Sequence, residues 1–258
     1  MKTLTTFASA AALALSLAVV AAPAHAAVFA HFTPDTNAND YKWVNNGALD
    51  TGTGGHFFSI TNNLQTTAHG VATHFSFLDP ALSALAFIPA TFTIDASVAS
   101  GNPATNIGPL YTQTNLTGNF SFIYTGATIN NYLGSGINLV HNSNLLSGVF
   151  TDAWIQGAGG SGSTNLAIGN GGSASYNSDY EQFANLANNS EEFAFNLLAV
   201  TPNFGGNSGV TALNHFVANG GGNFSFETVP EPATWGLMIM GFGGLGVVLR
   251  NRRRLAIA

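Results

Sequence analysis

The segment DTNAND, residues 35–40, is the part of the sequence whose residue types and spacing come closest to a metal site. Asp35, Asn37 and Asn39 reproduce the spacing of the oxygen ligands in the first half of a calcium-binding loop. Such a loop normally has glycine at its sixth position and a bidentate glutamate at its twelfth, where this chain has Asp40 and Asn46. We therefore favour a solvated turn over a calcium loop and expect no bound metal.

The possible catalytic groups show no arrangement typical of an enzyme. The chain has no cysteine, which excludes a thiol nucleophile and a cysteine-ligated metal. His69 and His74 are five residues apart, a spacing that places them on opposite faces of a strand. There is no G-x-S-x-G elbow of a serine hydrolase, and a glycosidase would need two converging carboxylates. We expect no enzymatic activity and no cofactor, with a secreted hydrolase as the weakest alternative.

Several tyrosines and tryptophans could form a platform for a sugar, because flat rings stack on the apolar faces of pyranoses while Asn, Asp and Gln supply hydrogen bonds. Packing in the core or at its rim is the favoured interpretation for each of them. The residues concerned are Tyr41, Trp43, Tyr111, Tyr132, Trp154, Tyr176 and Tyr180.

Residues 230–258 combine a proline-rich start, an apolar run and a basic end. The run Ala233–Leu249 carries no charge over seventeen residues, which as a helix would reach about 25 Å and just span a ~30 Å hydrocarbon core. Pro230-Glu231-Pro232 predicts an extended peptide above the membrane, because proline interrupts a helix and restricts the residue before it. Trp235 suits one membrane interface, and the positive charges suit the cytoplasmic end: Arg250, Arg252, Arg253 and Arg254.

Residues 1–26 have the organisation of a secretory signal peptide. Lys2 precedes an apolar stretch, Pro23 breaks it, and Ala24-His25-Ala26 is a small-x-small cleavage site. The mature chain is therefore expected to begin at Ala27. Because the signal peptide carries the following residues out of the cytoplasm, the terminal arginines would remain inside.

The order Pro-Glu-Pro, tryptophan, glycine-rich apolar helix and arginine cluster resembles the PEP-CTERM sorting signal of Gram-negative bacteria. The resemblance covers about a tenth of the chain, with Gly236 after the tryptophan where alanine is common and Asn251 interrupting the arginines. It implies recognition by exosortase, an integral-membrane transpeptidase, followed by removal of the tail. It also implies release or transfer of the exported part, often in bacteria that make exopolysaccharide.

The part between the two termini is acidic. From Ala27 to Val229 there are eleven acidic residues and a single basic one, Lys42, a net charge of −10. Binding to nucleic acid through its phosphates needs clustered Lys and Arg, so a nucleic-acid partner is not expected.

Apolar and polar residues alternate in several segments, which is typical of half-buried strands. Clear examples contain Phe75 and Phe77, Phe92 to Val98, Phe120 to Tyr124, Phe193 to Leu197, and Phe224 to Phe226. Glycine and asparagine clusters between them predict turns. We expect an all-β exported domain, an antiparallel β-sandwich of jelly-roll type over residues 27–229, with a single C-terminal transmembrane helix.

Other local patterns are weaker. Asp79-Pro80 and the pair Ser178 and Glu181 predict the starts of two short helices. The stretch of about 40 residues from Gly157 onward is rich in Gly, Ser and Asn, which predicts a long surface loop over at least part of it. The sequence GNFSF occurs twice, at 118–122 and 222–226, a repetition that the biased composition also explains.

These observations predict an exported protein that is anchored transiently in the inner membrane, processed by exosortase, and then held at the cell surface or released. A structural or adhesive role in an exopolysaccharide matrix or biofilm is expected. A carbohydrate-binding module is the alternative, for which exopolysaccharide is the possible partner.

Overall fold

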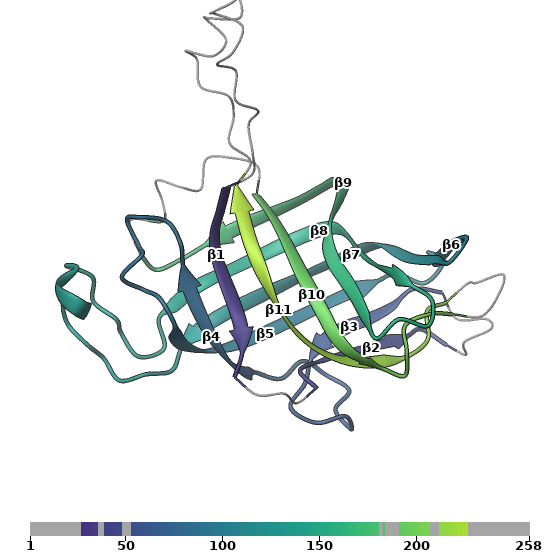
Figure 1. Cartoon of the computed structure of the whole chain (residues 1–258), viewed down its shortest axis with the longest axis horizontal. Coiled ribbons are helices and arrows are strands. Elements are labelled where there is room, and N and C mark those ends of the chain that lie inside the picture. Colours follow the sequence, from purple (N-terminus) through teal and green to yellow (C-terminus); the bar gives the residue numbers. More distant parts are fainter. Residues whose placement is uncertain are drawn as a thin grey trace, which may run out of the picture. The chain divides into compact units, whose positions relative to one another are not determined.

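The computed structural model describes residues 27–35, 39–47, 53–180, 183, 191–206 and 212–226, and the structural statements below concern these residues. Most of them lie in strands (Figure 1). The strands are β1 (Ala27–Pro34), β2 (Tyr41–Asn45), β3 (Gly55–Ser59), β4 (Val71–Phe77), β5 (Ile88–Val98), β6 (Thr105–Ile107), β7 (Leu110–Tyr124), β8 (Asn144–Ala158), β9 (Ser163–Asn177), β10 (Glu191–Thr201) and β11 (Phe216–Phe226), with one short 3-10 helix, η1 (Tyr132–Gly134), between β7 and β8.

The predicted alternation is confirmed in these strands. In β5, Phe92, Ile94 and Ala96 are buried while the residues between them are partly exposed. Strands β10 and β11 show the same period of two over most of their length. Because successive side chains of a strand point to opposite faces, this pattern buries one face of each strand and leaves polar side chains on the other.

All eleven strands are hydrogen-bonded into one sheet in the order β1-β4-β5-β3-β2-β11-β10-β9-β8-β7-β6, and every pairing between them is antiparallel. Two further pairings, β1–β11 and β5–β7, fold the sheet back on itself. The prediction of an antiparallel all-β protein is thus confirmed. The expected division into two separate sheets is not observed, and the sequential neighbours β6 to β11 differ from the Greek-key order of a jelly roll.

The folded sheet forms two layers. They belong to one sheet because some strands change partner along their length. One edge of β11 pairs first with β2, at Phe216 to Ala218, and then with β1, at Gly222 to Phe226. The change falls at a run of glycines, where a Cβ on Gly221 would lie 2.5 Å from the carbonyl oxygen of Phe32. A side chain would therefore prevent this close approach of β1 and β11.

Phenylalanine rings fill the space between the layers. Figure 1 shows β1, β11 and β10 crossing in front of β8 and β5. Between these layers the ring of Phe32 on β1 lies 4.9 Å from the ring of Phe92 on β5 and 4.9 Å from that of Phe122 on β7. Since all three side chains are at most 2% exposed, they form part of one continuous apolar core.

The two GNFSF segments lie on β7 and β11 and meet in this core. The ring of Phe224 lies 5.0 Å from that of Phe120 and 5.6 Å from that of Phe122. A Cβ on Gly118 would lie 2.6 Å from the Cα of Ala96 on the paired strand β5. Both copies of the motif therefore place large rings inward, and in β7 the glycine beside them permits close strand approach.

The first predicted helix, after Asp79, is wrong. Asp79 does accept a hydrogen bond from the N–H of Ala81, as an N-cap would, at 2.8 Å. However, Leu82 and Leu85 donate to residues three positions back, and the carbonyl of Leu85 accepts from Phe77 on β4. The segment forms turns because it reverses the chain between two paired strands and buries both leucines.

Where the structure describes the stretch from Gly157 onward, most of it lies in strands rather than in the predicted loop. Strand β8 continues to Ala158, and β9 occupies Ser163–Asn177. Glycine is tolerated here because the strands approach closely: a Cβ on Gly172 would lie 2.7 Å from the carbonyl oxygen of Thr151 on β8. The second predicted helix, from Ser178 to beyond Glu181, lies largely outside the described residues.

Within the described residues, no helix has the length and apolar character needed to cross a membrane. The predicted transmembrane helix, 233–249, lies outside those residues.

Candidate functional site

The calcium-loop residues do not assemble a metal site in the described part of the chain. The carboxylate of Asp35 lies 3.4 Å from Nδ1 of His74, and the amide of Asn39 donates to Asn63 Oδ1 at 3.3 Å. Asp40 is buried, and Asn46 donates its amide N–H to the carbonyl of Val98 at 3.0 Å. Asn37 lies outside the described residues, among which no three His, Asp or Glu side chains are grouped as metal ligands.

We expect millimolar calcium to leave the melting temperature unchanged within about 1 °C. An ion bound to the native state would instead raise it through the added free energy RT ln(1 + [L]/Kd). Thermal unfolding followed with calcium and with EDTA measures the difference. A rise of many degrees that Asp35→Ala removes would contradict the prediction.

Four of the aromatic residues considered for a sugar platform lie in the core. Trp43 and Tyr41 are at most 1% exposed, and Tyr176 and Tyr180 are each 7% exposed. The hydroxyl of Tyr176 donates to the carbonyl of Glu192. Core packing is thus confirmed for these four, while Tyr111 and Tyr132 pack partly buried against the core and Trp154 is half-buried.

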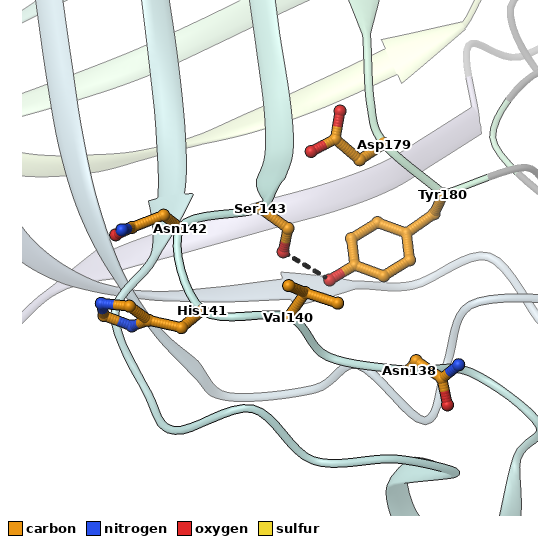
Figure 2. A pocket seen from close by; sticks show the side chains of 7 residues that line it. All are labelled: Asn138, Val140, His141, Asn142, Ser143, Asp179 and Tyr180. Atoms are coloured by element: carbon orange, nitrogen blue, oxygen red, sulfur yellow. Dashed lines mark hydrogen bonds between the residues drawn. The ribbon is translucent and has the colours of Figure 1, made fainter.

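A hollow of about 380 Å³ opens beside the start of β8 and the end of β9 (Figure 2). Two segments far apart in the sequence form it: the connection that enters β8, and the two residues that follow Ser178. Its lining is Asn138, Val140, His141, Asn142, Ser143, Asp179 and Tyr180. The volume lies at the lower end of the ~300–1,000 Å³ range of small-molecule sites.

Hydrogen bonds hold the two segments together. The N–H of Asn144 donates to Asp179 Oδ2 at 2.7 Å, and the N–H of Asp179 donates to the carbonyl of Asn144 at 3.0 Å. The hydroxyls of Ser143 and Tyr180 are 3.0 Å apart (Figure 2). Burial raises the pKa of Tyr180 from its ordinary value, so this hydroxyl is protonated at neutral pH. These hydrogen bonds therefore fix the shape of the hollow without the help of a ligand.

The histidine in the hollow has a defined orientation. Its backbone N–H donates to Thr128 Oγ1 at 3.0 Å, and His141 Nδ1 lies 2.9 Å from the carbonyl oxygen of Gly126. Since a carbonyl oxygen only accepts, Nδ1 carries a proton, and Nε2 is the ring nitrogen left for another partner. Neighbouring Asn142 has φ 66°, a left-handed conformation that asparagine adopts more readily than most residues.

Of these lining residues, only Tyr180 was among the candidates from the sequence, and it was assigned to the core. No local motif marks the others, because the hollow depends on contacts such as Asn144–Asp179 across 35 positions. The hollow contains a single carboxylate, that of Asp179, and glycoside hydrolysis requires two.

Two other carboxyl groups are perturbed by burial. Asp40, 4% exposed, and Glu191, at the start of β10, each have one buried oxygen without a hydrogen-bond partner in the described structure. Loss of hydration raises the pKa of both side chains to about 7, from ordinary values of 3.8 and 4.5.

We expect the protein to be less stable at pH 8 than at pH 5. Between pH 4 and 7 the native carboxyls of Asp40 and Glu191 keep protons that the unfolded chain releases, so stability falls as the pH rises through that window. Each 1 kcal/mol lost corresponds to a melting temperature lower by about 2–4 °C. Calorimetry across this pH range measures the change in stability. The double variant Asp40→Asn with Glu191→Gln should show a smaller difference in stability between pH 5 and pH 8. An unchanged pH profile in the double variant would contradict the assignment.

The sorting residues that the sequence singles out lie outside the described residues. The chain nevertheless matches the family model described as the PEP-CTERM protein-sorting motif over residues 228–254. This confirms the resemblance found in the tail. Neither a curated protein nor a solved structure is significantly similar to the chain. The matched range includes Pro230, Glu231, Pro232, Trp235, Arg250, Arg252, Arg253 and Arg254.

Proposed function

We propose that this chain, which carries the PEP-CTERM sorting motif, is a structural or adhesive protein of the cell surface or extracellular matrix that works among exopolysaccharides. The match at residues 228–254 is the observation that carries the proposal. The motif is the recognition signal of exosortase, which makes exosortase a partner and directs the chain out of the cell, with its C-terminus anchored in the membrane before processing.

The two ends have complementary roles in this proposal. Residues 1–26 start export, and the run Ala233–Leu249 crosses the inner membrane as a helix until processing. The arginines after it remain cytoplasmic and set the orientation. Pro230-Glu231-Pro232 is then accessible to exosortase on the outer side, and removal of the tail releases residues 27–229 for attachment or secretion.

The described part of the chain supports an extracellular role that does not involve binding of nucleic acid. Its lysine, Lys42, is already engaged, since Nζ donates to the carbonyls of Asn63 and Gln65 at 2.7 and 2.8 Å. With eleven acidic residues between Ala27 and Val229, the exported part carries no cationic cluster for phosphate. The antiparallel sheet presents Ser, Thr and Asn side chains on its outer face, a polar surface suited to hydrated matrix polymers.

A secreted hydrolase remains the weaker alternative, for which the hollow supplies one carboxylate. We propose a non-enzymatic role. Carbohydrate binding is the second candidate, and the polar hollow beside β8 favours it.

Mass spectrometry of the extracellular protein tests the proposal. The expected result is a chain without the tail and its arginines, recovered from the matrix or culture fluid, while any full-length chain stays with the inner membrane. An extracellular chain ending at Ala258 would show that the tail is only an anchor.

A further inference from the structure

We propose that the hollow lined by Asn138, residues 140–143, Asp179 and Tyr180 binds one neutral pyranose unit of an extracellular glycan. This deepens the proposed function, because it gives the exported chain a specific contact with matrix polysaccharide. The hydrogen-bonding groups of the hollow, its charge, its size and its fixed shape carry the inference.

The hollow offers hydrogen-bonding atoms of both kinds that have no partner in the described structure. Asp179 uses Oδ2 to bind the N–H of Asn144, which leaves Oδ1 as an acceptor. Asn138 uses its Oδ1 to accept from the N–H of Asn131, which leaves its amide N–H groups as donors. In Figure 2 the side chains of His141 and Asn142 point away from Tyr180, at the end of the lining opposite to Asn138. An acceptor on Asp179 and donors on Asn138 match the hydroxyls of a sugar, each of which both donates and accepts.

The charge of the hollow selects against anions. Its lining contains one carboxylate and no lysine or arginine. Phosphate, sulfate and uronate groups would therefore meet Asp179 without a compensating guanidinium or ammonium group. A neutral sugar avoids this repulsion and gains a charge-assisted hydrogen bond from one of its hydroxyls to the carboxylate.

The dimensions and the apolar contact suit a single ring. The volume is about 380 Å³, and the lining combines polar groups with the apolar surface of Val140 and the ring of Tyr180. Val140 is 49% exposed, so its methyl groups are available to the C–H face of a pyranose. In Figure 2, Val140 lies beside the Ser143–Tyr180 hydrogen bond, with Asp179 on the other side of the tyrosine ring.

The shape is fixed by contacts outside the hollow. Asn142 donates its backbone N–H to the carbonyl of Tyr124 at 3.0 Å, and Tyr124 donates its own to the carbonyl of Ser143 at 2.9 Å. These bonds continue the pairing of β7 and β8 into the connection that carries five of the lining residues. A ligand would thus bind without ordering a loop, which lowers the entropic cost of binding.

Saturation-transfer difference NMR on the full chain in detergent micelles tests the proposal. The probes are the methyl glycosides of glucose, galactose, mannose and N-acetylglucosamine, with glucuronic acid as the anionic counterpart. We expect saturable binding of at least one neutral glycoside, with a Kd near millimolar as for other single small ligands, and at least tenfold weaker binding of glucuronic acid. Absence of saturable binding for all four neutral glycosides would overturn the proposal, as would equal binding of glucuronic acid.

Two substitutions locate the site. Val140→Arg fills the hollow and should abolish binding, whereas Val149→Arg, at a 60% exposed position of β8 outside the lining, should leave it unchanged. Asp179→Asn preserves size and a hydrogen bond from Asn144 but removes the charge, and should weaken binding about tenfold. Equal binding by all three variants would place any sugar contact elsewhere.

A fourth variant separates this inference from the proposed function. Replacing Pro230-Glu231-Pro232 with alanines should stop processing without altering glycoside binding, because the hollow lies wholly within residues 138–180. Binding without processing, or processing without binding, therefore identifies which of the two proposals fails.

Discussion

Replacing Pro230-Glu231-Pro232 with three alanines should leave essentially all of the protein as a full-length chain in the inner membrane. Export should continue, because residues 1–26 are unchanged. Exosortase, however, would lose the motif that lies within the matched residues 228–254. The apolar run Ala233–Leu249 would then keep the exported part attached. Immunoblotting of the membrane and extracellular fractions measures the change.

Neutralising the four terminal arginines provides the matched control. The variant with glutamine at 250, 252, 253 and 254 retains Pro230-Glu231-Pro232 but loses the charges that hold the tail end in the cytoplasm. We expect mixed orientation and partial release of uncut chain, rather than uniform retention. Normal cleavage of the triple-alanine variant would show that these three residues do not direct processing.

The substitution Phe122→Ala should destabilise the exported part by about 3–5 kcal/mol, the usual cost of removing a fully buried phenylalanine. Phe122 is 0% exposed and lies at the centre of the aromatic core. Its ring centroid is 4.5 Å from that of Phe92, 4.8 Å from that of Phe75 and 4.9 Å from that of Phe32. Because strands of both layers supply these rings, the cavity would weaken the packing between the layers rather than a single hairpin.

Phe87→Ala serves as the control for the same chemical change. Phe87 is 65% exposed, and its ring stacks on that of His74 with 3.9 Å between centroids. We expect its loss to change the free energy of unfolding by less than about 1 kcal/mol. Urea denaturation of both variants gives the two values. Similar costs for Phe87 and Phe122 would mean that the rings are not packed as described.

The all-β class of the fold could be predicted from the sequence because it depends on patterns within single short segments. A strand with one buried face must alternate apolar and polar residues, and Phe92, Ile94 and Ala96 do so without reference to any other part of the chain. The tail was equally readable, since Pro230-Glu231-Pro232, the apolar run and the arginines are contiguous and correspond to the matched motif.

Two predictions made from short segments of the sequence differ from the structure. In isolation the segment after Gly157 has the composition of a loop, yet Gly172 lies in β9 because the neighbouring strand β8 comes too close for a side chain. Similarly, Asp79 begins a turn rather than a helix because the carbonyl of Leu85 accepts its hydrogen bond from β4. In both cases contacts with a neighbouring strand, rather than the local composition, decided the conformation.

By itself the sequence determined the alternating strands, the acidic body and the sorting tail, because each depends on residues that lie close together along the chain. Only the tertiary structure decided the strand order and the hollow. Gly221 allows β11 to approach β1 after its pairing with β2 has ended, and Asn144 reaches Asp179 across 35 positions to close the hollow. Contacts of this kind are set by the packing of whole strands on a shared core, whose free energy depends on surfaces that meet only in the folded chain.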